Sequence, residues 1–312
     1  MIKKNTMKNI IENVINQEIK GLEQLKNTFE IEKFEELVNK ISFMTGKVII
    51  AGIGKSGHIA QKIAASMCSI GKPSVFLHLT EASHGDLGMI SSNDIVIILS
   101  NSGEGLEITR TINYCRNLRI FVVGISRDQT SYLISHADMS IVLPMTPEAS
   151  NLDIPTTSST MMLVFGDVLT IALKEVSSLT QDQYITYHPG GKIGMKGMQV
   201  KDVMITKDRL PIIHYKASIL STAVEISLKK LGFTIVIDDD GGMLGIVFAE
   251  AIKNNDKIAF DCMSNEYKII SGNLKIGNII EDLSQYKYLI VLQDGKPEGV
   301  LFDELIHFQT NL

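Results

Sequence analysis

AGIGKSGH, residues 51–58, follows the apolar run KVIIAG and precedes a stretch in which apolar residues recur at helical spacing. Its glycines, Gly52, Gly54 and Gly57, match the G-x-G-x-x-G pattern of a strand–turn–helix unit that binds dinucleotides. The same stretch contains Gly-Lys-Ser, the end of a nucleotide phosphate loop. Both patterns place a tight turn between a strand and a helix. The stretch therefore predicts an α/β fold, whose ligand the rest of the sequence has to decide.

Outward from this turn, residues 47–176 alternate between short apolar runs and amphipathic segments. The apolar runs are KVIIAGIG, PSVFLHL, DIVIILS, RIFVVGIS and MSIVLPM. Because they are continuous rather than alternating, they predict strands of a parallel sheet that helices cover on both faces. A longer run, TSSTMMLVFGDVLTIALKEV, predicts a buried helix that closes the region. Helical periodicity over residues 7–45 predicts lead-in helices that pack on this core or on another subunit.

A glycine-rich stretch, HPGGKIGMKGM at 188–198, separates this region from a second one. There, STAVEISLKKLG and IGNIIEDLSQ predict helices, and each is followed by two short apolar runs around an Asp-Gly pair. Asp-Gly between apolar runs is a strong hairpin signal. The repetition predicts a smaller domain made of two copies of one supersecondary unit, each too small to bury its own apolar face.

The composition is that of a folded protein without a broad charged surface. The chain has 312 residues, of which 45% are hydrophobic, and a formal net charge of −5. These values allow two domains and argue against nucleic-acid binding. Cys68, Cys115 and Cys262 are scattered, so they indicate neither disulfides nor a zinc cluster. Because no run resembles a signal peptide or a membrane span, a soluble, cytoplasmic protein with no membrane partner is expected.

Three polar loops follow strands of the predicted sheet, where ligands of open parallel sheets bind. They are GIGKSGH (52–58), EASHGDLG (81–88) and SNSGEGLE (100–107). In the third loop, Ser100 and Ser102 supply hydroxyl donors and a helix start follows, which favours a phosphate group. Two such loops on separate strands fit one monophosphate, although serine and glycine also serve as ordinary helix caps.

Both nucleotide interpretations weaken when the flanking residues are considered. An ATP phosphate loop requires a glycine five residues before Gly54, and that position is Ile49. A dinucleotide site requires an acidic residue at the end of the second strand, about 20 residues on. Only Glu81 stands near that place. A lone G-x-G-x-x-G pattern is weak evidence, so NAD is disfavoured as the ligand.

Six motifs resemble, in order and spacing, those of the sugar-isomerase (SIS) domain of D-arabinose-5-phosphate isomerases. They are GIGKSGH, EASHGDLGM, LSNSGE, PTTSST, GDVLTIAL and YHPGGKIG. The residues after 198 resemble the tandem CBS module that follows the SIS domain in that family. The resemblance implies N-terminal helices over 1–45, a doubly wound five-stranded parallel SIS domain over 46–197, and a smaller, degenerate α+β tandem CBS domain over 198–312.

The resemblance implies an aldose–ketose isomerase that interconverts D-ribulose 5-phosphate and D-arabinose 5-phosphate through an enediol. Its product feeds the synthesis of Kdo for lipopolysaccharide or capsule. The reaction moves a proton between C1 and C2, so it needs a base, a group that stabilises the enediolate oxygen and a catalyst of ring opening. It requires no redox cofactor or metal, although a non-essential or inhibitory divalent ion such as zinc is compatible with it. A sugar phosphate is the expected ligand, and a homotetramer is the expected assembly.

By the resemblance, the catalytic residues are Lys55, Glu107, Glu148 and His188. Either Glu148 or His188 transfers the proton. Lys55 stabilises the oxyanion, and Glu107 orients the sugar or Lys55. The substrate-binding residues are Ser56, His84, Ser100, Asn101, Ser102, Ser158 and Ser159. His78 matches a position that takes a divalent ion in relatives, but one histidine does not make a site. Glu107 also fits an exposed first-turn acid, and His188 also fits a plain loop residue.

Two segments depart from the family pattern. EASNLDIPTTSST, residues 148–160, is one residue shorter than in relatives and carries Ser150-Asn151 in place of Cys-Pro, which puts substrate preference in question. GIVFAEAI, in the first repeat, lacks the Asp and Arg residues that grip a nucleotide, which favours a role in assembly or folding. Two alternatives stay open, an isomerase of another phosphosugar and a non-catalytic sugar-phosphate sensor.

Overall fold

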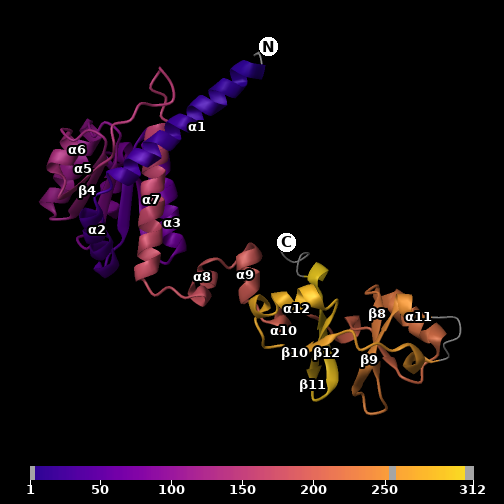
Figure 1. Ribbon diagram of the computed structural model, residues 1–312. Coiled ribbons are helices and arrows are strands. Elements are labelled where there is room, and N and C mark those ends of the chain that lie inside the picture. The colour runs from indigo at the N-terminus through magenta and orange to yellow at the C-terminus, as the bar shows by residue number, and fades with distance from the viewer. Residues whose placement is uncertain (1–3, 253–257, 306–312) are drawn as a thin grey trace. The chain divides into compact units, whose positions relative to one another are not determined.

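The structure is a computed structural model that describes residues 4–252 and 258–305. The chain divides into two compact units, one up to residue 187 and one from residue 188 onward (Figure 1). Among the described residues, no helix is long and apolar enough to cross a membrane.

The first unit alternates strands and helices along the chain. Its strands are β1 (Val48–Gly52), β2 (Ser74–His78), β3 (Ile95–Leu99), β4 (Phe121–Ser126) and β5 (Met139–Val142). Its helices are α1 (Lys4–Asn27), α2 (Ile31–Phe43), α3 (Gly54–Ser69), α4 (Leu79–Ala82), α5 (Leu106–Asn117), α6 (Tyr132–His136), α7 (Thr157–Val176) and α8 (Gln181–Tyr187), with a 3₁₀ turn η1 (Asp86–Met89).

Within the described residues, the five strands of this unit form one parallel sheet in the order β2-β1-β3-β4-β5. Each apolar run that predicted a strand contains one of them, so the doubly wound five-stranded fold is confirmed. The chain winds from β1 to β2 on one side and then returns to place β3 on the other side of β1. Ligands of doubly wound sheets bind at such a switch point, beyond the carboxyl ends of the strands.

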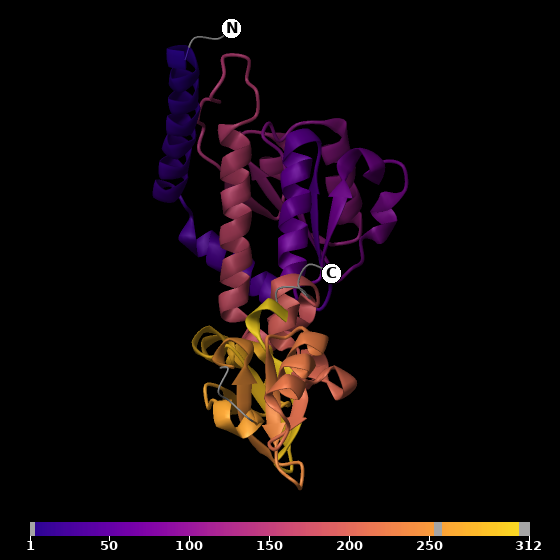
Figure 2. The same ribbon diagram turned by 90° about the vertical axis from the view of Figure 1, so that its right-hand side faces the viewer.

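Helices cover both faces of this sheet, as continuous apolar strands require. Along β1, Val48 and Ile50 face the helices α2, α3 and α7, whereas Ile49 and Ala51 face the helices α4, α5 and α6. All four side chains are fully buried. Figure 2 shows α3 and α7 running side by side along the first of these faces.

Two glycines allow the helices on this face to approach closely. A Cβ on Gly166 of α7 would lie 2.2 Å from the side chain of Ile63 on α3, and a Cβ on Gly21 of α1 would lie 2.4 Å from Thr157. These contacts fix α7 between α1 and α3. They thereby place the N-terminus of α7 at the edge of the unit where the strands end.

The second unit contains two arrangements of the same kind, with the elements in the same order. The first is β7 (Ile212–His214), α11 (Ile219–Lys229), β8 (Phe233–Ile237) and β9 (Met243–Phe248); the second is β10 (Lys268–Ile270), α12 (Ile280–Gln285), β11 (Leu289–Gln293) and β12 (Lys296–Leu301). In each, two parallel strands are followed by an antiparallel one, and both predicted Asp-Gly hairpins are present. A short strand, β6 (Ile205–Thr206), adds to β12.

The segment that links α8 to these repeats packs with the second unit. It forms α9 (Gly191–Gly197) and α10 (Val200–Val203). Met195 of α9 belongs to the apolar core that includes Leu289 and Leu301. The division therefore lies ten residues before the boundary at 197 expected from the sequence, because α9 buries its apolar side chain in that core.

Candidate active site

The turn between β1 and α3 places Lys55 and Ser56 in the first turn of a helix. Lys55 is exposed and Ser56 is half-buried. Gly54 has φ +58, a left-handed value that favours glycine, and open space lies where its Cβ would stand. Ile53 at the N-cap supplies no side-chain hydrogen bond. The first N–H groups of a helix have no intrahelical acceptor, so this turn is suited to hold an anion.

A second turn of the same chemistry follows β3. Ser100 Oγ accepts a hydrogen bond from Gly103 N at 3.0 Å, and Ser102 Oγ accepts one from Glu104 N at 3.3 Å. Because both hydroxyls act as acceptors here, the proton of each is left to donate. Gly103 has φ +69, which lets the backbone turn back on itself.

The strand register brings these two turns together. Gly52, the last residue of β1, lies opposite Leu99, the last residue of β3. Neighbouring strands are about 4.8 Å apart. The GIGKSGH and SNSGE turns therefore leave the same edge of the sheet side by side, at the switch point, as two halves of one phosphate site would.

The last residue of β4 and the first residue of α6 hold the second turn in place. Ser126 Oγ donates a hydrogen bond to Asn101 O at 3.1 Å. The backbone N of Tyr132, at the start of α6, donates to Glu104 Oε1 at 2.7 Å. The turn is thus tied on two sides to residues about 25 positions later in the sequence, which fixes its shape before any ligand binds.

Glu148 lies at the N-terminus of α7, where it is only 8% exposed. Its Oε2 accepts hydrogen bonds from Thr156 N at 2.8 Å, from Thr156 Oγ1 at 3.1 Å and from Ser158 N at 3.2 Å. A carboxylate in this position satisfies the first N–H groups of the helix and matches its dipole. Its other oxygen, Oε1, is buried and accepts no hydrogen bond from the described residues.

These contacts decide the ionisation of Glu148. Burial by itself raises the pKa of the carboxyl group, but hydrogen bonds from Ser158 and Thr156 outweigh burial and bring the pKa below its ordinary value of 4.5. Glu148 is therefore ionised at neutral pH, the form that can take a proton from carbon.

Further buried polar atoms lie at the same edge of the sheet. His78 ends β2 opposite Gly52, Ser83 follows α4, and Asn101 follows β3. His78 Nδ1, Ser83 Oγ and Asn101 Oδ1 have no hydrogen-bond partner among the described residues. Buried polar groups are nearly always paired. Within the described part of the chain these three atoms have no protein partner, so they are available to form hydrogen bonds with a polar ligand or with water at this edge of the sheet.

The other residues predicted for this unit lie on nearby helix starts and turns. Glu107 is half-buried in the first turn of α5, where the helix dipole also favours an acid. His84 is exposed in the turn after α4. Ser159 Oγ donates to the Thr156 carbonyl at 2.9 Å and so helps to form the start of α7.

A polar groove borders Glu148. Its walls are the shortened loop at 147–153 and one face of α1 that carries Asn13, Asn16, Gln17 and Lys20. Gln17 Nε2 donates a hydrogen bond to the Pro147 carbonyl at 2.9 Å, which ties the loop to the helix. Helix α1 therefore contributes to the surroundings of Glu148.

Known proteins combine this fold with these motifs. The SIS-domain family matches residues 44–172. Arabinose 5-phosphate isomerase KdsD of Yersinia pestis is 39% identical over 257 residues, which make up 79% of this chain and 78% of that protein. The chain belongs to the arabinose 5-phosphate isomerase family of SIS-domain proteins.

Two further relatives extend the match. A Rickettsia prowazekii protein, RP505, is 38% identical over 255 residues, or 82% of this chain and 80% of that one. The solved structure of c3406 from Escherichia coli CFT073, in complex with arabinose 5-phosphate, is 37% identical, with a TM-score of 0.58, and covers 60% of this chain and 100% of its own. The SIS domain of this chain thus has a relative of the same fold that binds a sugar phosphate.

One predicted catalytic residue does not lie in the same compact unit as the SIS-domain sheet. His188 begins the second unit, where it is half-buried and lies three residues before the start of α9 at Gly191. Gly194 lies so close to this segment that a Cβ on it would meet Pro189 O at 2.1 Å. The HPGG segment and α9 therefore form one compact piece of backbone.

His78 has too few potential metal ligands around it, among the described residues, to form a metal site. No group of three or more His, Cys, Asp or Glu side chains with metal-binding geometry is found in residues 4–252 and 258–305. A zinc site normally needs at least three protein ligands. His78 alone therefore does not fit a resident metal site.

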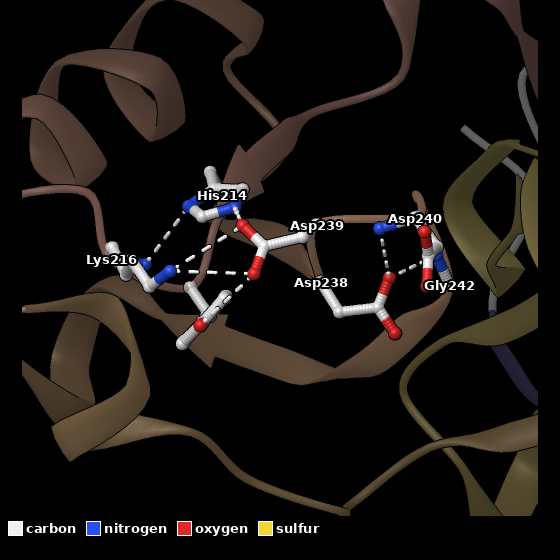
Figure 3. Close-up of polar contacts among 7 residues, drawn as sticks. His214, Lys216, Asp238, Asp239, Asp240 and Gly242 are labelled. Atoms are coloured by element: carbon white, nitrogen blue, oxygen red, sulfur yellow. Dashed lines mark hydrogen bonds and ion pairs between the residues drawn. The ribbon is translucent and has the colours of Figure 1, made fainter.

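The acidic turn of the second unit serves the local fold (Figure 3). Asp239 accepts hydrogen bonds from His214 Nε2 at 3.0 Å, from Tyr215 OH at 3.3 Å and from Lys216 Nζ at 3.3 Å. Asp238 Oδ1 accepts from the backbone N of Gly242 at 2.7 Å. These bonds shape the β8–β9 hairpin and tie it to the end of β7, and they pair the charge of Asp239 with Lys216.

Sequence reasoning missed three contributors to the SIS-domain site. Glu104 and Ser126 brace the SNSGE turn, and Thr156 holds Glu148. The only sequence signal for them is their place next to a strand end or inside PTTSST. Their roles depend on partners 8 to 28 positions away, which a single sequence does not reveal.

Proposed function

We propose that this protein interconverts D-ribulose 5-phosphate and D-arabinose 5-phosphate. The observation that carries the proposal is the pairing of two turns at the switch point, GIGKSGH with Lys55 and Ser56, and SNSGE with Ser100 and Ser102. These turns suit a monophosphate. The buried, ionised Glu148, with one oxygen unpartnered among the described residues, supplies the base that an enediol reaction needs.

In the proposed reaction, Ser56, Ser100 and Ser102 hold the phosphate, together with the first N–H groups of α3. Glu148 removes a proton from C1 of the ketose, and the electron pair moves to form the enediol while the C2 carbonyl oxygen gains negative charge. Lys55 stabilises that oxygen electrostatically. The proton of the O1 hydroxyl passes to O2, and Glu148 then returns its proton to C2 as the C1 carbonyl forms, which gives the aldose. These assignments rest on the family's motifs and on the positions of the side chains.

The other residues that the family motifs assign have separate roles in the proposed reaction. Glu107 orients sugar hydroxyls or Lys55, and His84, Asn101, Ser158 and Ser159 complete the sugar pocket. His188 is the second candidate for proton transfer or ring opening. We expect His188→Ala to lower kcat by about 10²-fold or more if it transfers the proton. Near-normal turnover would remove His188 from that role.

The proposal includes an oligomer, which we expect to be a tetramer. α1 exposes apolar side chains along its length, namely Met7, Ile10, Ile11, Ile15 and Ile19, each between 42% and 53% exposed. An exposed apolar stripe along a helix favours contact with another protein surface. A second copy of the chain is the partner expected for an enzyme of this family.

The proposed biological setting rests on the chain's membership of the family. We propose a cytoplasmic enzyme that supplies arabinose 5-phosphate for Kdo, in lipopolysaccharide or capsule. The second unit is proposed to be a degenerate tandem CBS module with a role in assembly or folding. Isomerisation through an enediol needs neither a redox cofactor nor a metal, so we propose that the enzyme requires none and that a divalent ion such as zinc is at most inhibitory.

The test is to incubate the purified protein with D-ribulose 5-phosphate and follow arabinose 5-phosphate by NMR. We expect conversion to an equilibrium mixture from either side, without added metal and in the presence of a chelator. A folded protein that forms no arabinose 5-phosphate would overturn the assignment.

The shortened loop makes another phosphosugar the second candidate substrate. Ser150, Asn151 and Asp153 line the groove beside Glu148, so they differ from relatives close to the proposed base. Hexulose and heptulose phosphates should be compared with ribulose 5-phosphate in the same assay. A kcat/KM for one of them larger than that for ribulose 5-phosphate would make that sugar the assigned substrate.

A further inference from the structure

The two oxygens of the Glu148 carboxylate have opposite surroundings. Oε2 accepts three hydrogen bonds, two from Thr156 and one from Ser158. Oε1 is buried and accepts none from the described residues. An oxygen that already accepts three hydrogen bonds is a poor proton acceptor. The unpartnered oxygen is therefore the basic one.

The hydroxyl of Thr156 has a fixed direction. Thr156 Oγ1 accepts a hydrogen bond from Ala149 N at 2.9 Å, and the same oxygen lies 3.1 Å from Glu148 Oε2. A hydroxyl has a single proton, and a carboxylate only accepts. The proton of Thr156 must therefore point at Oε2, so that Ala149, Thr156 and Glu148 form one directed chain of hydrogen bonds.

These hydrogen bonds also close the 148–156 loop, which differs in sequence from relatives. Residues 150–155 leave the Glu148 region and return to it, and the bonds between Thr156 and residues 148 and 149 join the two ends. Between them, Asn151, Leu152, Asp153, Ile154 and Pro155 are exposed. The loop is thus exposed at its tip and tied at its base by Thr156, together with the bond from Ser158 N to Glu148 Oε2.

We propose that Thr156 is a positioning residue for the isomerase reaction, which holds Glu148 by Oε2 so that Oε1 faces the substrate as the proton acceptor. The inference rests on the proposed function. It adds which oxygen of Glu148 reacts and which side chain keeps it in place. Thr156 itself does not touch the substrate in this scheme, and it acts only through Glu148.

Two effects of removing the hydroxyl follow. Glu148 loses one of the donors that outweigh its burial, so its pKa rises. The carboxylate also loses one of the three bonds that fix its rotation, so Oε1 is less often aligned with the C1–H bond. Small misalignments of a catalytic group cost up to about 10²-fold in rate. The cost falls on kcat, because the phosphate turns that dominate binding are untouched.

The experiment compares Thr156→Val, Thr156→Ala and Thr156→Ser with Thr170→Val in the ribulose 5-phosphate assay. Thr170 is the matched control, since it is a buried threonine on the same helix whose hydroxyl donates to Gly166 O at 2.8 Å, far along α7 from Glu148. Each variant is checked for folding by circular dichroism and thermal unfolding. Rates are measured as functions of substrate concentration and pH.

We expect Thr156→Val and Thr156→Ala to lower kcat by about tenfold to a hundredfold, with KM changed by less than about threefold. The acidic limb of the kcat/KM profile should move to higher pH. Thr156→Ser, which keeps the donor, should restore most of the rate, and Thr170→Val should match the wild type.

The inference is overturned if folded Thr156→Val and Thr156→Ala keep the wild-type rate and pH profile. It is also overturned if Thr156→Ser is as slow as Thr156→Val, because the site would then need the shape of threonine rather than its hydroxyl. An inactive wild-type protein would reject the proposed function itself, and that result is read separately from the comparison of variants.

Discussion

Lys55 is the residue whose setting most clearly separates an isomerase from a plain phosphate binder. It lies exposed in the first turn of α3, next to Ser56 and beside the turn after β3. A phosphate can be held by the serines and the helix N-terminus alone. A lysine in addition is suited to stabilising charge on a reacting oxygen.

Lys55→Met should therefore lower kcat by about 10²-fold or more, because the enediolate loses its cation. Lys62→Met is the matched control. Lys62 lies two turns further along the same helix in a half-exposed ion pair with Asp167, and such pairs contribute little to stability. Steady-state kinetics on both variants make the comparison. An active Lys55→Met protein would show that the lysine serves only to bind.

Glu148 makes a prediction about stability as a function of pH. Its pKa is lowered in the folded protein, so its ionised form stabilises the fold above the unfolded value of about 4.5, and the contribution is lost as the pH falls through the folded pKa. Glu148→Gln keeps an acceptor for the three donors but removes the charge. The wild type should therefore melt at a higher temperature than Glu148→Gln at pH 6–8, and the gap should close below about pH 4.5.

Thermal unfolding of the two proteins from pH 8 to pH 4 checks this expectation. Phosphate is left out of the buffer so that no anion binds at the GIGKSGH and SNSGE turns during the measurement. A gap that stays constant down to pH 4 would mean that the charge of Glu148 does not stabilise the start of α7.

At this scale the sequence was informative where a residue's role follows from its neighbours in the chain. Lys55, Ser56, Ser100 and Ser102 could be placed in turns beyond the strand ends, because each stands between an apolar run and the helix that follows it. The role of Thr156 could not be predicted, because it depends on a carboxylate eight residues earlier that folds back on it.

At the scale of elements, the contact between α3 and α7 positions the residues of the site. α7 brings Thr156 and Ser158 to Glu148, and α3 brings Lys55 and Ser56 to the β1 edge. The two helices touch where Gly166 leaves room for Ile63. Their close packing therefore helps to set where Lys55 and Ser56 lie relative to Glu148.

Gly166→Ala should destabilise the protein by about 1–2 kcal/mol, because the overpacking cost exceeds the gain in helix propensity. The added Cβ would lie 2.2 Å from the Ile63 side chain. Urea denaturation measures the change. In an Ile63→Ala background the clash is removed, so the same substitution should become neutral or stabilising. Equal effects in both backgrounds would show that the helices do not meet there as described.

The helix bounds show what periodicity can and cannot predict. The apolar run at 157–176 coincides with α7 because its pattern runs along the whole helix. α3 starts at Gly54, inside the AGIGKSGH stretch and before the apolar periodicity begins, because glycine and lysine carry no apolar periodicity. The loop after β2, expected to be irregular, contains α4 and η1, which are too short to show a period.

At the scale of the whole molecule, the exposed face of α1 bears on assembly. Figures 1 and 2 show the N-terminal half of α1 extending past the start of α7. Ile11 and Ile15 lie four residues apart on this half and are 52% and 53% exposed. A partner surface over this stripe would bury them.

Ile11→Glu/Ile15→Glu should therefore lower the molar mass measured by light scattering on a sizing column, because charges on the stripe oppose its burial. Lys8→Glu/Glu12→Lys is the control. It reverses an exposed ion pair of 3.6 Å on the same helix and keeps the net charge, so it should leave the mass unchanged. An unaltered mass in the isoleucine variant would mean that the subunits meet elsewhere.

The central claim is that this SIS domain performs proton transfer at carbon, and not binding alone. The most direct measurement is NMR of the wild-type protein with D-ribulose 5-phosphate in deuterated water. The account predicts arabinose 5-phosphate that carries deuterium at C2, together with loss of the effect in Glu148→Gln. Binding of ribulose 5-phosphate with neither product nor deuterium at C1 or C2 would contradict it and identify the protein as a sensor.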